Sequence, residues 1–135
     1  MADFEQFMID ICTEHEWTWD KEGDAIIFQV PFSDGRHQTC SALIVSSSWG
    51  SLVEVRSIVG KKAEFDPANY EALLVFNNEK MAYGRVVISD NEEFIMVVSR
   101  SLADSADKEE VEVMIKEASA YGDILEQKYY NRDEM

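Results

Sequence analysis

Two pairs of cysteine and histidine are the residues best suited to chemistry in this sequence. Cys12 and His15 stand three positions apart, and His37 and Cys40 have the same spacing. Thiolate and imidazole groups are the usual ligands of tetrahedral zinc, so a zinc site is the first hypothesis. On a helix Cys12 and His15 share a face, whereas on a strand His37 and Cys40 point to opposite sides of the sheet. Four convergent ligands are therefore not expected, and buried, unreactive cysteines are predicted instead.

Other catalytic patterns are incomplete. The serine-rich stretch 46–51 lacks the glycine-flanked serine of a nucleophile elbow, and neither histidine stands beside a motif that completes a triad. The acidic stretch 104–110 lacks the central glycine and spacing of a calcium loop. It suits a helix start, where carboxylates complement the dipole. The 6 glycines are scattered, so no phosphate loop is present. The sequence predicts no catalytic residue, cofactor or metal.

Hydrophobic periodicity predicts the elements that must position these residues. Apolar stripes at helical spacing indicate three helices, and alternation with a period of two indicates five strands. The predicted helices cover 3–15, 66–80 and about 105 or 107 to 129, and the predicted strands cover 25–32, 37–46, 52–59, 82–89 and 93–100. Short turns between successive strands require antiparallel pairing. We therefore expect one α+β domain over 1–135, an antiparallel five-stranded sheet flanked by three helices in the order α-β-β-β-α-β-β-α, with residues 131–135 frayed.

The predicted sheet has more apolar surface than a single covered face requires. Residues 94–98 are apolar at every position, although a sheet with helices on one face needs only one apolar side. A second subunit, a client segment, or helices on both faces would cover the other side. A homodimer would do so through a self-complementary patch. The candidate partner-binding residues are Trp49, Val53, Val55, Phe94, Met96 and Val98.

Net charge limits the partners. Asp and Glu number 27 against 12 Lys and Arg, which gives a formal net charge of -15. Such a chain repels nucleic-acid phosphates and anionic membranes, so neither is an expected partner. The acidic surface either selects cationic partners or serves only to keep the protein in solution. Two cysteines, no apolar run of about 20 residues, and an N-terminus unlike a signal peptide favour the cytoplasm.

The second half of the chain resembles the YbjN family, whose fold is similar to that of type III secretion chaperones. Residues 73–77, LLVFN, resemble the end of the family's second helix, and residues 81–85, MAYGR, resemble its next strand. Asp90-Asn91-Glu92 resembles the following turn, and a long acidic helix over 107–127 follows in the same place. The first half matches only in the order of its elements. The resemblance implies a small protein-binding domain that is often homodimeric. YbjN proteins have been described as sensory-transduction regulators.

The function predicted from these features is a non-enzymatic protein-binding module, either chaperone-like or a regulatory adaptor. The alternative is a small-molecule or metal sensor, which an apolar pocket lined by Trp17, Trp19 and Phe28 would support. An enzyme is a third hypothesis. It would require a cleft in which His15 or His37 is hydrogen-bonded to a carboxylate.

Overall fold

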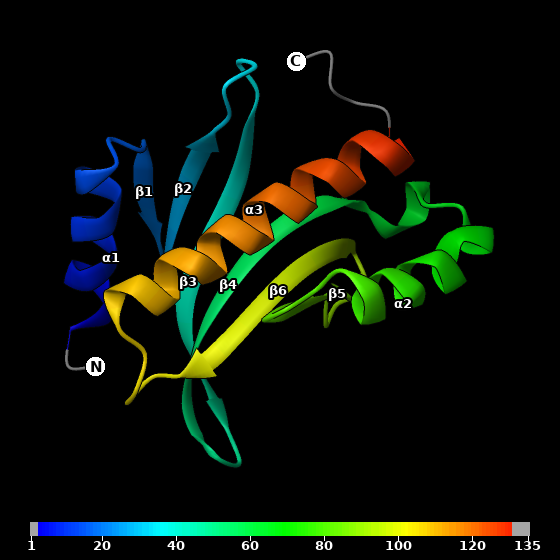
Figure 1. The fold of residues 1–135 in the computed structure, drawn as a ribbon. Coiled ribbons are helices and arrows are strands. Elements are labelled where there is room, and N and C mark those ends of the chain that lie inside the picture. The colour runs from blue at the N-terminus through cyan, green and yellow to red at the C-terminus, as the bar shows by residue number, and fades with distance from the viewer. Residues whose placement is uncertain (1–2, 131–135) are drawn as a thin grey trace.

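The strands form one open antiparallel sheet, and the helices pack on the same side of it (Figure 1). The computed structural model describes residues 3–130. The strands are β1 (Trp19–Glu22), β2 (Ala25–Pro31), β3 (His37–Ser47), β4 (Gly50–Lys61), β5 (Gly84–Ile88) and β6 (Phe94–Leu102), in the spatial order β1-β2-β3-β4-β6-β5. The α-helices are α1 (Phe4–Glu14), α2 (Tyr70–Glu79) and α3 (Lys108–Tyr130). The α+β class and the three helices are confirmed.

The predicted number of strands is wrong, because the sheet has six strands and not five. The additional strand is β1, which pairs antiparallel with β2 from Trp19 opposite Phe28 to Glu22 opposite Ala25. All four of its side chains are exposed. A strand without a buried side shows no alternation of apolar and polar residues, so hydrophobic periodicity cannot detect it.

Side-chain caps define where the helices begin. Asp3 accepts a hydrogen bond from the backbone N–H of Gln6 at 3.1 Å and caps α1. The predicted start at Asp66 is also observed, with its carboxylate accepting from Ala68 N–H at 3.0 Å. The turn that follows, Pro67–Asn69, is a 3-10 helix, and α2 begins only at Tyr70. Within residues 3–130, no helix combines the length and apolar character needed to cross a bilayer. The predicted frayed end at 131–135 lies outside the described residues.

Helix α3 crosses the sheet over strands β3, β4 and β6 (Figure 1). Five apolar residues of its stripe are buried and join the core formed by the same face of the sheet: Val111, Met114, Ile115, Ala118 and Leu125. Tyr121, expected in the same stripe, is only partly buried, and Ser119 and Gly122 are buried as well. The helix packs tightly on β4 at Gly122, where an added Cβ would lie 2.3 Å from Ser57 Oγ and 3.0 Å from Ser57 Cβ. Only glycine fits here without displacing the helix or the strand.

Replacement of Gly122 by alanine should lower the free energy of unfolding by about 1–3 kcal/mol, the usual range for overpacking a core. The sign of this change identifies the cause, because replacing glycine by alanine inside an exposed helix would instead raise the free energy of unfolding by about 1 kcal/mol. Chemical denaturation of Gly122→Ala measures the change, and adding Ser57→Ala should recover part of it. An increase in stability for Gly122→Ala would contradict the close approach of α3 to β4.

Candidate functional site

The face of the sheet opposite the helices carries many apolar side chains, and no helix of residues 3–130 covers it. Opposite residues in antiparallel strands share a face, so the pairing of Ile58 with Met96 and of Arg56 with Val98 places all four on one side. Their strand neighbours Val55 and Val97 lie in the core beneath the helices. The same register gives the apolar residues of the open face as Ile27, Leu43, Val45, Leu52, Ile58, Val87, Phe94, Met96, Val98 and Leu102. The prediction that the sheet is apolar on both sides is confirmed.

The predicted partner-binding residues divide between the two faces. Val53 and Val55 are fully buried in the core, and their assignment as surface contacts is incorrect. The odd positions of β4 face α3, and alternation within one strand does not reveal which side the helix covers. Phe94, Met96 and Val98 do lie on the open face.

Trp49 is placed differently from the other candidates. It lies in the turn between β3 and β4, a hairpin whose tip projects beyond the rest of the sheet (Figure 1). Its side chain is 88% exposed. Trp49 is therefore accessible to a partner but does not form part of the sheet face itself.

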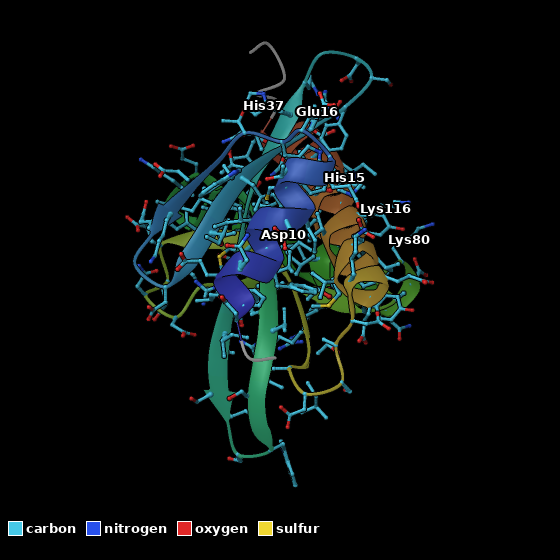
Figure 2. The ribbon with its side chains drawn as sticks, turned by 90° about the vertical axis from the view of Figure 1, so that its left-hand side faces the viewer. Asp10, His15, Glu16, His37, Lys80 and Lys116 are labelled. Atoms are coloured by element: carbon cyan, nitrogen blue, oxygen red, sulfur yellow. The ribbon has the colours of Figure 1, made fainter. Side chains whose placement is uncertain are left out.

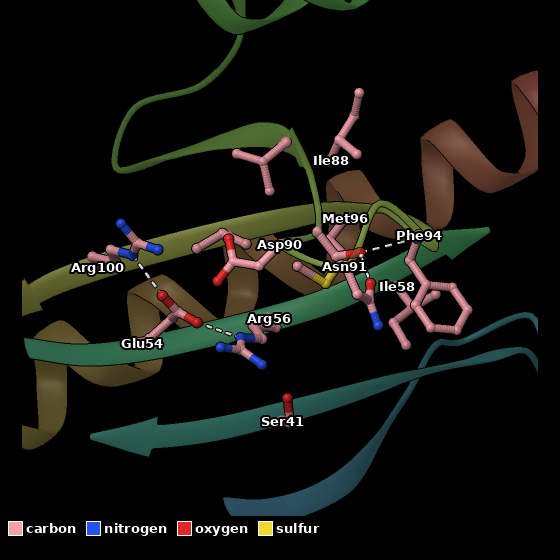
Figure 3. A pocket seen from close by; sticks show the side chains of 13 residues that line it. Ser41, Glu54, Arg56, Ile58, Ile88, Asp90, Asn91, Phe94, Met96 and Arg100 are labelled. Atoms are coloured by element: carbon pink, nitrogen blue, oxygen red, sulfur yellow. Dashed lines mark hydrogen bonds and ion pairs between the residues drawn. The ribbon is translucent and has the colours of Figure 1, made fainter. Parts of the chain in front are cut away.

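A trough of about 530 Å³ runs along the open face above β4 and β6 (Figure 3). The hairpin turn that joins β5 to β6 forms one wall. Apolar and charged side chains line the trough together: Glu54, Arg56, Ile58, Val87, Ile88, Asp90, Phe94, Met96, Val98 and Arg100, with Ser41, Ser89 and Asn91. Met96 and Val98 are only 9% and 2% exposed although no helix covers them, so neighbouring side chains shield them. The trough therefore has an apolar floor and charged walls.

Glu54 lies between two arginines on this face. One of its oxygens accepts from Arg56 Nε and the other from Arg100 Nε, the latter at 2.5 Å (Figure 3). Glu54 is 1% exposed, while the arginine side chains are 36% and 43% exposed. A buried carboxylate is tolerated only when it is paired in this way. No local signal indicates this group, because a glutamate that alternates with valines along a strand is the usual pattern of a solvent-exposed face.

Both edges of the sheet are closed to an added strand. At the β5 edge, Asn77 donates to Val86 C=O at 3.2 Å and accepts from Val86 N–H at 2.6 Å. Glu117 accepts from the N–H groups of three successive residues, Ala82, Tyr83 and Gly84. At the other edge, β1 is short and carries exposed charges, a common protection against strand pairing. A partner would therefore meet the face of the sheet rather than its edge.

A second hollow, of about 490 Å³, lies on the helical side between the end of α1, β2 and α3. His15 Nε2 and Glu112 Oε2 are 2.6 Å apart at its rim, and the imidazole stacks on Trp17. Figure 2 shows His15 beside Lys116 of α3. The other lining residues are mostly apolar: Val30, Pro31, Phe32, Ile115, Ser119 and Ala120. Of the three residues predicted to line such a pocket, Trp17 does so and Phe28 stacks beneath it, whereas Trp19 does not line it.

The end of α1 explains the position of His15 and Trp17. Glu16 has a φ of 60°, its N–H donates to Thr13 C=O, and Trp17 N–H donates to Cys12 C=O. This pair of bonds is a Schellman motif, which ends the helix and reverses the chain. The reversal turns Trp17 back against His15.

The hydrogen bond between His15 and Glu112 meets the condition set for an enzyme, a histidine paired with a carboxylate in a cleft. Ser119 is the only hydroxyl residue among those that line it, and its Oγ donates to Lys116 C=O in the same helix at 3.3 Å. His37 is exposed on β3, while Cys40 is buried, so the predicted separation of these residues to opposite faces is confirmed. Among residues 3–130 there is no group of three or more His, Cys, Asp or Glu arranged to hold a metal.

No family model matches the sequence, and no curated protein matches it. Two residues beside the β5 edge have clear structural roles. Asn77 brackets Val86, and Gly84 lies where an added Cβ would be 2.4 Å from Val98 C=O. Both residues secure β5 against its neighbours.

The two cysteines should react only when the protein unfolds. Burial raises the pKa of Cys12 to about 11 and that of Cys40 to about 12. At pH 8 a thiol with a pKa of about 11 is ionised in roughly one molecule in a thousand, and only the thiolate reacts. Labelling with a disulfide reagent should therefore be slow in buffer and fast in urea. Cys12→Ser and Cys40→Ser variants assign the two reactions, and rapid labelling of the folded protein would contradict the burial.

The raised pKa values of Cys12 and Cys40 also make the stability of the folded protein depend on pH. The thiol pKa values are raised in the folded state, so folding favours the neutral form. This contribution is fully present below the unfolded pKa of about 8.5 and is lost as pH rises toward the folded values.

Proposed function

We propose that this protein is a non-enzymatic protein-binding module that uses the open face of its sheet. The observation that carries the proposal is the apolar face that no helix of residues 3–130 covers. Ile58 and Leu102 on this face are 42% and 47% exposed. Exposed apolar side chains grouped on one face of a domain usually mark a site of association.

The arrangement also indicates how a partner would bind. Strand addition is disfavoured because Asn77 and Glu117 occupy the backbone groups at the β5 edge. A partner segment would instead lie across the face, with its side chains in the trough and against Leu52 and Leu102. Trp49, at the projecting hairpin, extends the accessible surface beyond the sheet. Aromatic side chains are common anchors of such contacts.

Two kinds of partner suit this face, and both were expected from the sequence. A second copy would form a homodimer, and a client segment would make the protein chaperone-like or a regulatory adaptor. The resemblance to YbjN proteins and type III secretion chaperones supports this class of function. The buried, unpaired thiols of Cys12 and Cys40 suit a reducing cytoplasm, where we place the protein.

Replacement of Ile58 by aspartate should abolish partner binding or self-association, because it places a charge in the middle of the apolar face. Ile124→Asp is the matched control, since Ile124 is similarly exposed, at 47%, on the outer side of α3. Light scattering measures the oligomeric state, and cross-linked capture from the host lysate measures partner binding. Equal behaviour of the two variants in both measurements would reject the open face as the binding surface.

The second hollow supports a different candidate function, a sensor of a small ligand. It offers an apolar cavity, the stacked Trp17 ring and two hydrogen-bonding groups, His15 and Glu112, at one rim. A few polar groups around an apolar hollow are typical of ligand pockets. The hollow adjoins α1, α3 and β2, so an occupant would alter how these elements pack together.

A ligand in the second hollow should change the fluorescence of Trp17. In a Trp19→Phe, Trp49→Phe background, Trp17 is the remaining tryptophan. Screening a library of small aromatic compounds should then yield binders that shift its emission. Ala120→Phe should fill the hollow and remove binding, while Ile124→Phe should not. The absence of binders, or binders insensitive to Ala120→Phe, would reject the sensor.

A further inference from the structure

The charged residues of the open face form an arrangement that an apolar docking surface does not require. Glu54 is 1% exposed and binds Arg56 and Arg100 through their Nε atoms alone. Among residues 3–130, the Nη groups of these two arginines have no hydrogen-bond partner. Each guanidinium therefore keeps donors available while its orientation is fixed by the carboxylate. Guanidinium groups held in this way are suited to planar, bidentate recognition of an anion.

The trough lacks the negative excess of the protein as a whole. The four charged residues that line it are Arg56, Arg100, Glu54 and Asp90, so its formal net charge is zero. A third arginine, Arg85, lies on the same face because it pairs with Val98. Asp90 lies at the rim but makes no ion pair with Arg56 or Arg100 within the described residues. The chain as a whole carries a net charge of -15.

The neighbours of the arginines define the rest of the ligand. Ile58, Phe94, Met96 and Val98 line the same trough. A ligand that fits must therefore present a carboxylate flanked by apolar groups. An extended peptide segment with one acidic residue between apolar residues has this chemistry, since alternate side chains of an extended chain point the same way.

We propose that Arg56 and Arg100 bind the carboxylate of an aspartate or glutamate in an apolar segment of a different protein. The inference rests on the proposed function, because it uses the same face. A second copy of this chain is a poorer occupant. It brings the same net charge of -15, so two copies repel each other at long range. Glu54 acts as a positioning residue that aims the two guanidinium groups.

Selection of peptides tests this proposal without knowledge of the natural partner. A display library of random twelve-residue peptides is panned against the full-length protein. The expected binders are apolar sequences in which one position is enriched in Asp or Glu. For a synthetic peptide of the selected sequence, changing that acid to its amide should weaken binding at least about tenfold, as for loss of a charge-assisted hydrogen bond.

The matching change in the protein is Arg100→Lys, which keeps a cation beside Glu54 and so preserves folding better than a neutral residue. It should weaken the acidic peptide about tenfold and leave the amide peptide unchanged, because lysine lacks the planar fork. Arg56→Lys should behave in the same way. Thermal denaturation of both variants confirms that they are folded. Equal losses for the two peptides would overturn the assignment.

The peptide selection distinguishes failure of the arginine site from failure of the docking face as a whole. Binders lost in Ile58→Asp but without an enriched acid would keep the docking face and overturn the arginine site. Binders unaffected by Ile58→Asp would reject the docking face and the arginine site together. Binding of inorganic phosphate to Arg56 and Arg100, with no preference for acidic peptides, would also overturn the proposal, because it would assign the pair to phosphate.

Discussion

The close contact between α3 and β4 is the constraint on which the rest of the structure depends. Gly122 allows the helix to lie directly on Ser57, where any side chain would collide. From this position the helix buries its apolar stripe against three strands, β3, β4 and β6. Side chains of α3 then fix the other helices: Glu112 meets His15 after α1, and Tyr121 packs edge-on against Phe76 of α2. With all three α-helices of residues 3–130 gathered on one face, the other face has no cover from this part of the chain.

The helices cover only one face of the sheet, and this arrangement leaves a buried charge on the other face. Val55 and Ser57 of β4 turn toward the helices, so Glu54 and Arg56 must turn away from them. Glu54 is nevertheless withdrawn from water, because Arg56 and Arg100 extend across it. A buried ion-paired group is weak evidence of a gain in folding stability, since apolar residues of the same volume often give an equally stable protein. Its presence is better explained by what it does to the arginines, whose directions it fixes.

The sequence alone predicts the long elements and misses what depends on tertiary contacts. The stripe of α3 and the alternation of β2, β4 and β6 identify those elements, because each has a side that is buried along its length. β1 has no such side and escapes detection. Alternation separates Val55 from Arg56 but does not say which of the two meets a helix, and so Val53 and Val55 were assigned to the wrong surface. The pairing of His15 with Glu112, 97 residues away, has no local signal at all.

The two hollows lie on opposite faces of the sheet and differ in what they can select. The second hollow is lined in part by α3. Its selectivity would depend mainly on how well the shape of a ligand fits against Trp17 and Phe32. The trough on the open face combines shape with charge, and it lacks the net negative charge of the surrounding protein. Long-range repulsion by a net charge of -15 discourages acidic partners in general. An acidic residue can therefore dock only where two oriented arginines compensate for that repulsion at short range. This combination favours a partner that is neutral or basic overall and carries one acidic residue at the correct position, which is a more selective requirement than either apolar contact or net charge alone.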